Sequence, residues 1–193
     1  LHIPGTYFVT PAAMGDDKKQ LDGRCDRIKE IQADRPDTTW GVHGWDHKMI
    51  KKGTSLDIIG KSIDKTVEFM KGCGIKPTLF RPPFGVLTDK EADYISTDRN
   101  LIIAQWNVEP NDSSSKSESE DKVFDRLRND FEKNVGIGNG AVILLHDSMF
   151  VNRPNLIAMI FHYFHELNYK FVSGQECYDG CNEAICTGGG TGP

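Results

Sequence analysis

The chain has 193 residues, of which 38% are hydrophobic and 26% are charged, and its formal net charge is −5. This length fits one sizeable domain, and the composition is ordinary for a globular protein. The acidic balance argues against a nucleic-acid-binding protein, because neutralising phosphates requires a basic surface. No apolar run approaches the ~20 residues that are needed to span a bilayer.

Short apolar or β-branched runs alternate along the chain with longer amphipathic stretches. Several of the short runs are continuously apolar, as expected for strands that are buried on both faces. These runs predict six strands, at 6–9, 39–43, 78–81, 101–106, 141–146 and 170–173.

Three stretches between these runs have the apolar periodicity of helices. The run 55–74 places its apolar side chains on one stripe and begins where Thr54 and Asp57 are spaced for a capping box. Similar stripes predict helices at 121–136 and 155–167. Alternating strands and helices predict an α/β fold with a parallel sheet and outer helices, either a barrel or a doubly wound sheet.

The two ends of the chain and its cysteines set the expected domain organisation. Residues 1–175 are expected to form one folded domain, and residues 176–193 a Cys-rich tail that ends in a Gly-rich linker. Three of the five cysteines crowd into "CYDGCNEAIC" without a histidine, which favours a disulfide-bonded tail in an oxidising compartment over a zinc knuckle. The odd count leaves one thiol without a partner in the chain.

Chemically active residues follow the predicted strands in order, at the edge where parallel α/β folds place their sites. His43 and His47 follow 39–43, Arg81 follows 78–81, the run "WNVEPND" follows 101–106, and His146 ends 141–146. The polar stretch 111–122 is expected to be a solvated loop. The first two histidines are spaced to bind one divalent ion, for which zinc is a common choice.

The other residues at these strand ends have a structural and a functional interpretation each. His146 is either a core histidine or a general acid, with Asp112 or Glu109 to stabilise its charged form. Arg81 either forms a structural salt bridge or orients a catalytic carboxylate. Trp45 and Trp106 line a sugar-binding groove or serve packing. The remaining pair, His162 and His165, is expected to lie on a helix surface.

The ordered set "HGWDH", "RPPFG", "WNVEPND" and "ILLH" resembles the polysaccharide deacetylases of carbohydrate esterase family 4. "GTYFVT" also resembles the strand that follows the family's first motif, so that the resemblance spans residues 5 to about 174. It implies a distorted (β/α)-barrel of about seven strands. It also implies metal-dependent hydrolysis of N-acetyl groups on N-acetylglucosamine units of chitin, peptidoglycan or a related glycan.

The resemblance assigns a role to each candidate residue. His43 and His47 would bind Zn²⁺, or alternatively Co²⁺. His146 would protonate the departing nitrogen with Asp112 tuning it, and Arg81 would orient the catalytic base. On the substrate side, Phe84 lies in the motif whose backbone amide donates to the oxyanion, and Leu145 lines the acetyl pocket. Trp45 and Trp106 stay candidates for the walls of the groove. The expected protein is a secreted or cell-wall-associated monomer with a glycan substrate.

Several departures from the family pattern leave the activity open. The family's T-F-D-D-G motif, which supplies the base and the third metal ligand, should precede "GTYFVT", where the chain has "LHIP". Asp16 and Asp17 lack that context. Gly44 replaces a Ser or Thr, Lys48 a Pro, Glu109 an Asp and Ser113 a Trp.

These departures lead to three hypotheses. In the first, the chain is an active deacetylase whose first strand and Asp-Asp motif lie upstream of Leu1, so that the 193 residues alone have little activity. In the second, it is an inactive relative that binds glycans. In the third, it is a metal-dependent hydrolase of another amide.

Overall fold

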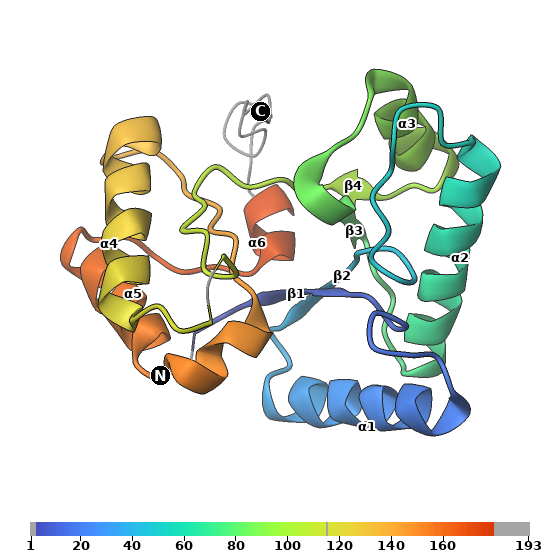
Figure 1. Cartoon of the computed structure of the whole chain (residues 1–193), viewed down its shortest axis with the longest axis horizontal. Helices are drawn as coiled ribbons and strands as arrows, with labels where there is room; N and C mark the ends of the chain where they lie inside the picture. Colours follow the sequence, from blue (N-terminus) through green and yellow to red (C-terminus); the bar gives the residue numbers. More distant parts are fainter. Residues whose placement is uncertain (1–2, 115, 180–193) are drawn as a thin grey trace.

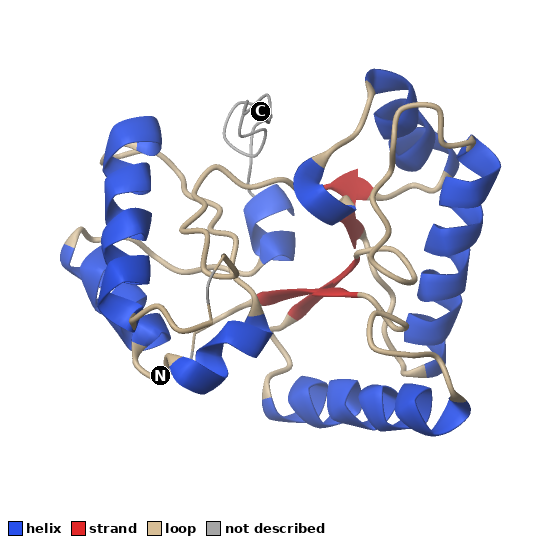
Figure 2. Cartoon of the chain, in the orientation of Figure 1, coloured by secondary structure: helices blue, strands red, loops and turns tan. Residues whose placement is uncertain are grey.

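The computed structural model describes residues 3–114 and 116–179. Its centre is a parallel sheet of four strands, shown in Figure 2, and the strands are adjacent in chain order. They are β1 (Thr6–Val9), β2 (Thr39–Val42), β3 (Leu79–Phe80) and β4 (Ile102–Ile103).

The helices are α1 (Lys18–Asp34), α2 (Leu56–Gly72), α3 (Asp89–Asp93), α4 (Glu120–Asp130), α5 (Leu156–Glu166) and α6 (Gly174–Asp179). Helices α1 to α3 lie between successive strands in the chain, and α4 to α6 follow the last strand. Shorter 3₁₀ turns, η1 (Pro83–Gly85) and η4 (Asp147–Asn152), follow β3 and His146. The π-helical turns η2 (Tyr94–Asp98) and η3 (Phe131–Val135) extend α3 and α4.

Two hydrophobic clusters lie in different parts of the molecule. The first joins the sheet to α1 and α2, with Val42, Ile63 and Phe80 among its most deeply buried members. The second joins α4 to α5 through Leu127, Phe131 and their neighbours. Figure 1 shows α1 and α2 at one end of the molecule and α4 and α5 at the other, with the sheet between them.

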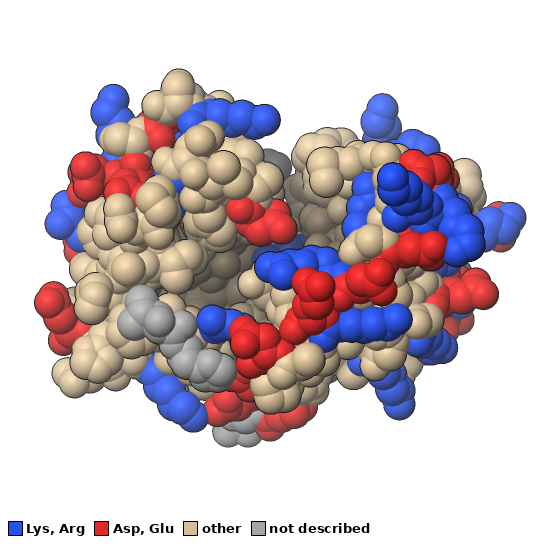
Figure 3. Space-filling model, turned by 90° about the horizontal axis from the view of Figure 1, so that it is seen from below, with Lys and Arg blue, Asp and Glu red and all other residues tan. Residues whose placement is uncertain are grey.

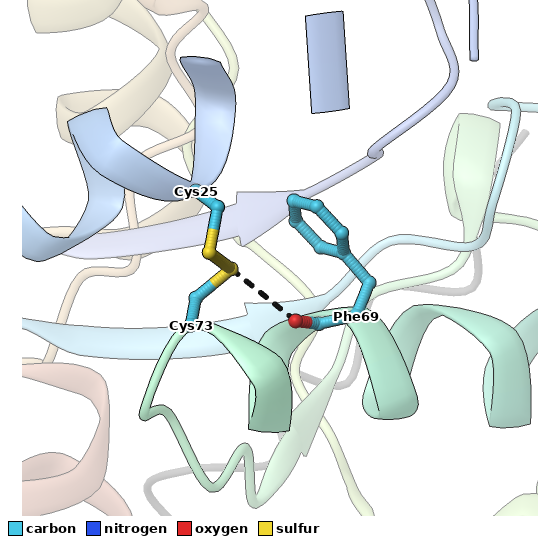
Figure 4. Close-up of a disulfide and its surroundings, with 3 residues drawn as sticks. All are labelled: Cys25, Phe69 and Cys73. Atoms are coloured by element: carbon cyan, nitrogen blue, oxygen red, sulfur yellow. Dashed lines mark hydrogen bonds between the residues drawn. A yellow bond between two sulfur atoms is a disulfide. The ribbon is translucent and has the colours of Figure 1, made fainter. Parts of the chain in front are cut away.

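A disulfide between Cys25 and Cys73 joins α1 to the end of α2, as Figure 4 shows. The sulfur of Cys73 lies 3.2 Å from the carbonyl oxygen of Phe69. The sequence did not indicate this pairing, because the two cysteines are 48 residues apart. The predicted bridges of the tail fall on Cys181 and Cys186, which lie outside the described residues.

The first four predicted strands are confirmed, but β3 and β4 have only two residues each. The prediction of strands at 141–146 and 170–173 was wrong. In the first segment, Ile143 forms a single parallel bridge with Val108. The side chain of Asn107 accepts a hydrogen bond from the backbone N–H of Val142 and donates one to the carbonyl oxygen of Gly140. These side-chain hydrogen bonds replace part of the ladder there.

The second segment, 170–173, pairs with no strand of the sheet within the described residues. Just beyond 170–173, the backbone N–H of Gly174 donates to the hydroxyl of Thr6, and that of Gln175 to the hydroxyl of Thr39. The last strand is therefore absent within the described part of the chain. The α/β class and the parallel sheet are confirmed, whereas the described residues form an open sheet rather than a closed seven-stranded barrel.

The three predicted helices are present with shifted ends. Helix α2 is capped by Ser55, whose hydroxyl accepts from the backbone N–H of Ile58, rather than by the predicted box of Thr54 and Asp57. Helix α4 begins at Glu120, inside the stretch that was predicted to be a loop. None of the helices in the described ranges has the length and apolar character needed to cross a membrane.

Basic and acidic side chains lie side by side on the face seen in Figure 3. Helix α1 contributes ion pairs between Lys18 and Asp22 and between Arg27 and Glu30. Such exposed pairs each contribute at most about 1 kcal/mol to stability. These charged side chains lie on the solvent-exposed face of α1, whereas Ile28 is its buried residue.

Candidate active site

The backbone beyond each strand continues the register of the sheet and delivers the predicted residues to one edge. The N–H of His43 donates to the carbonyl oxygen of Val9 over 3.0 Å, and that of Arg81 to the carbonyl oxygen of Val42 over 2.9 Å. Because all strands are parallel, these residues emerge at the carboxyl end of the sheet, as predicted.

The loop after β2 brings the imidazoles of His43 and His47 to a centroid separation of 4.8 Å. The chain turns back here through two left-handed conformations, at Gly44 (φ 78°) and at His47 (φ 56°). The first favours glycine, which explains why Ser or Thr is absent from that position. The hydroxyl of Ser62 accepts from the N–H of Trp45 instead and fixes the loop to α2.

The ring of His43 is held by the backbone of the neighbouring strand. Its Nδ1 lies 2.6 Å from the carbonyl oxygen of Arg81. A carbonyl can only accept, so Nδ1 carries the proton and Nε2 keeps its lone pair. Histidines that bind a metal through one ring nitrogen typically donate a hydrogen bond from the other, as Nδ1 of His43 does here.

Both imidazoles are held in the neutral form that a metal requires. Burial lowers the pKa of His43 to about 4, and the neighbouring charges of His47, Arg81 and His146 act in the same direction. Burial also lowers the pKa of His47, with a further contribution from His146. The charge of His146 contributes to the lowered pKa of both rings.

His146 is paired with Asp112 through two hydrogen bonds. The Nδ1 of His146 lies 2.8 Å from Oδ1 of Asp112, and the backbone N–H of His146 donates to Oδ2 over 2.8 Å. The side chain of Asp112 is 1% exposed, and that of His146 is 42% exposed. The hydrogen bond with Asp112 raises the pKa of His146, and the more distant Glu109 and Asp147 act in the same direction.

Arg81 lies in an aromatic enclosure beside this edge. Its Nε donates to the carbonyl oxygen of Ala104 over 3.0 Å, and its guanidinium lies 4.1 Å from the ring of Phe8 and 5.5 Å from that of Trp106. Burial lowers its pKa to about 10. Within residues 3–114 and 116–179, no carboxylate forms an ion pair with Arg81. Phe8 was not predicted as a site residue, although its position in a strand that leads to this edge is a usable signal in the sequence.

The predicted substrate-binding residues divide between two places. Phe84 is exposed, with its ring 4.9 Å from that of His47, and Leu145 directly precedes His146 and packs on the second hydrophobic cluster. Trp106 donates its indole N–H to Glu109 and lies beside Arg81.

Trp45 is oriented differently. It packs on Phe69 of α2, lies under the ammonium group of Lys65 and lines a cavity of about 250 Å³ with α2 residues. The structure brings Trp45 into no recorded contact with His146.

His43, His47 and Arg81 thus lie at one edge of the parallel sheet, and the charge of His146, which is bonded to Asp112, acts on both of the other rings. Sequence comparison assigns the part of the chain that holds His43, His47 and Arg81 to a family. Residues 1–98, half of the chain, match the family described as "Polysaccharide deacetylase". The chain belongs to the polysaccharide deacetylase family.

Two curated members of this family show how far the similarity extends. The peptidoglycan-N-acetylmuramic acid deacetylase PdaC of Bacillus subtilis is 31% identical over 108 residues, which cover 55% of this chain and 20% of that protein. The peptidoglycan-N-acetylglucosamine deacetylase PgdA of Listeria monocytogenes is 25% identical over 140 residues, which cover 72% of this chain and 27% of that protein. The chain therefore spans between a fifth and about a quarter of these relatives.

Solved structures of polysaccharide deacetylases share the fold. The structure of PdaC from Bacillus subtilis has a TM-score of 0.67 and 22% identity, and covers 91% of this chain and 77% of that chain. The wild-type protein BA3943 from Bacillus anthracis, described as a CE4 family pseudoenzyme, has a TM-score of 0.70 and 21% identity, with 90% and 55% covered.

Polysaccharide deacetylases typically depend on a metal, and the described residues fit this requirement in part. His43 and His47 supply two neutral nitrogen donors, whereas a catalytic zinc site takes three protein ligands and an open position. In the described part of the chain, no group of three His, Cys, Asp or Glu side chains is arranged to hold an ion. Asp17 caps α1 by accepting from the N–H of Gln20, and Asp16 is exposed, so neither carboxylate joins the histidines.

Proposed function

We propose that this protein acts on an N-acetylated polysaccharide, such as chitin or peptidoglycan, by hydrolysing the acetamide bonds of its N-acetylglucosamine units. The observation that supports the proposal most is the pair of imidazoles of His43 and His47 at the sheet edge, on which the charge of His146, bonded to Asp112, acts. Three motifs far apart in the sequence supply these residues. The family membership and the two peptidoglycan deacetylases among the relatives support the choice of substrate class.

His43 and His47 would hold the divalent ion, Zn²⁺ or alternatively Co²⁺. Such an ion polarises the acetamide carbonyl and lowers the pKa of bound water. The buried Arg81 has no carboxylate partner among the described residues. A buried cation is strongly destabilised without such a partner. This supports a role for Arg81 in orienting a catalytic carboxylate that lies outside those residues.

His146 would protonate the departing nitrogen. The carboxylate of Asp112 accepts from Nδ1, so Nε2 is the atom that can deliver a proton to the substrate. The raised pKa of His146 keeps this proton available near neutral pH. The backbone N–H of Phe84 is the proposed donor to the oxyanion, and Leu145 and Trp106 are the proposed contacts of the acetyl group and the sugar.

A second candidate function is glycan binding without catalysis. It is favoured by the incomplete donor set in the described residues and by the fold shared with BA3943, a protein described as a pseudoenzyme. Hydrolysis of a different amide is the third alternative. For either glycan function, the disulfide and the cell-wall relatives support a secreted or cell-wall-associated protein.

Acetate release from an N-acetylglucosamine tetramer, measured in the presence of zinc, separates these functions. The 193-residue chain should release acetate slowly, and His146→Ala should lower the rate by about 10²- to 10⁴-fold while zinc binding, followed by calorimetry, is retained. His162→Ala, which changes an exposed histidine of α5, is the matched control and should behave as the wild type.

The remaining outcomes are decisive as well. Oligosaccharide binding without acetate release supports the inactive relative. Release of a carboxylate from other amides but not from the tetramer supports the third function. Absence of binding and of turnover with every substrate overturns the proposed substrate class.

A further inference from the structure

The loop that carries Asp112 has one apolar residue, the buried Pro110, and is otherwise polar or charged. This Asp112 loop, residues 110–114 and 116–118, contains proline, asparagine, serine and charged residues. The side chain of Asp112 is nevertheless almost completely buried. Buried backbone and carboxylate groups need hydrogen-bond partners, so the loop must be held by polar contacts from outside.

Arg126 of α4 supplies the first set of these contacts. Its Nε donates to the carbonyl oxygen of Pro110 over 2.8 Å, and one terminal nitrogen lies 3.3 Å from the carbonyl oxygen of Asn111. The same guanidinium forms a bidentate pair with Glu118, at 2.5 and 2.6 Å. Arg126 therefore joins the two ends of the Asp112 loop to α4.

Arg153, which follows η4, supplies the second set. It is 1% exposed and among the largest fully buried side chains in the described ranges. Its guanidinium donates to the carbonyl oxygen of Asp112 over 2.9 Å and to that of Glu118 over 3.1 Å. Because η4 begins directly after His146, these contacts close a ring: His146 binds the carboxylate of Asp112, and the chain beyond His146 binds the backbone of Asp112.

We propose that Arg126 and Arg153 are positioning residues for His146, which act by fixing Asp112 against its ring and backbone. Both carboxylate oxygens of Asp112 are used by His146, so a small rotation of the loop breaks both hydrogen bonds at once. Four carbonyl oxygens of the loop receive donors from the two guanidinium groups. The proposal rests on the proposed function insofar as His146 is the acid.

The consequence for the reaction lies in the tautomer of His146. As long as Asp112 is fixed, the neutral ring carries its proton on Nδ1 and leaves Nε2 facing the substrate side. Arg153→Lys and Arg126→Lys keep the positive charge but remove the planar set of donors, which lysine cannot replace. In these variants the Asp112 loop is no longer held in place, and the imidazole of His146 can adopt the Nε2-protonated tautomer.

Ring ¹⁵N NMR of the metal-free 193-residue chain, recorded at a pH high enough for His146 to be neutral, tests this directly, since it distinguishes the two tautomers of the neutral ring. The wild type should show the Nδ1-protonated form, and both lysine variants should shift toward the Nε2-protonated form. Arg128→Lys is the matched control, because Arg128 lies on the same helix but pairs with the exposed Asp125. Its spectrum should equal that of the wild type.

The same arginine substitutions made in an Asp112→Asn variant distinguish a positioning role from a general loss of stability. In Asp112→Asn, the arginine substitutions should cause no further change in the ring signals of His146, because their effect passes through the carboxylate. Folded lysine variants with wild-type ring signals, or equal shifts in both backgrounds, would overturn the proposal. If Arg153→Lys fails to fold, Arg126→Lys and Glu118→Gln decide the question at half-exposed positions.

The NMR measurement does not require turnover, so the positioning proposal can be refuted independently of the proposed function. An inactive protein with the expected tautomer changes would retain the positioning role and lose the deacetylase role.

Discussion

A histidine that is buried beside other cationic groups resists protonation, and His43 shows the consequences at the scale of a single residue. Its pKa is about 4 in the folded protein and about 6.5 in an unfolded chain. Between these values the unfolded state binds more protons than the folded state. The free energy of unfolding therefore falls as the pH falls from about 6.5 toward 4.

This dependence leads to a prediction for the metal-free protein. His43→Gln, which keeps a donor for the carbonyl oxygen of Arg81, should flatten the decline, which amounts to roughly 3 kcal/mol at most for the wild type. His146 acts in the opposite direction, because its raised pKa stabilises the fold at low pH and loses that effect as the pH rises. Urea unfolding between pH 7 and 4 in the presence of a chelator measures the difference. Equal slopes for both proteins would contradict the assignment.

Gly85 is a second residue whose environment makes a sharp prediction. Its φ is +72°, and a Cβ at this position would lie 2.6 Å from the ring of Trp106. Gly85→Ala should displace this ring and weaken binding of an N-acetylglucosamine oligomer by about three- to tenfold. Gly138→Ala is the matched control, since Gly138 also has a positive φ but no atom near its Cβ. Equal affinities for the two variants, measured by calorimetry, would remove Trp106 from the glycan site.

At the scale of elements, the segments that could be predicted from the sequence are those with a clear apolar pattern at the expected place along the chain. The strands before His43 and Arg81 were predictable because each is short, apolar and followed by a motif residue. Helix α2 was predictable from its stripe of Ile59, Ile63 and Met70. Residues 141–146 have the same apolar character but form one bridge, because the side chain of Asn107 replaces part of the ladder.

Helix α1 was missed for the opposite reason. Only Ile28 is buried among the 17 residues of this helix, so the sequence has no apolar periodicity that would indicate a helix here. Other contacts hold it in place: Gln32 accepts from the indole N–H of Trp40, and Cys25 is bonded to Cys73. Neither contact has a signal in the spacing of residues along the chain.

The dependence of α1 on few contacts predicts a large effect of its disulfide. Replacing Cys25 and Cys73 together by serine should lower the free energy of unfolding by about 2–4 kcal/mol, because the bond closes a loop of about 50 residues in the unfolded chain. Guanidinium unfolding measures this. The reduced wild type should resemble the double variant, whereas the double variant should be insensitive to reductant. A wild type that is unaffected by reductant would contradict this role.

At the scale of the whole molecule, the site lies between two hydrophobic clusters that the chain builds in sequence. The cluster around α2 carries the loop with His43 and His47, and the cluster around α4 and α5 supports His146 through Leu145. The convergence of these residues was predictable from the parallel order of the strands. A third metal donor and a catalytic base were not predictable, because the T-F-D-D-G motif to which the resemblance assigns them does not occur in the 193 residues.

The central claim is that His43 and His47 bind one divalent ion next to His146. An anomalous-scattering map of crystals soaked in Zn²⁺ tests it most directly. The account predicts one strong peak at about 2.0–2.1 Å from a ring nitrogen of each of His43 and His47, with the ring of His146 facing it but not bound. No peak between these two imidazoles, or a zinc ion bound elsewhere in the chain while they stay free, would contradict the account.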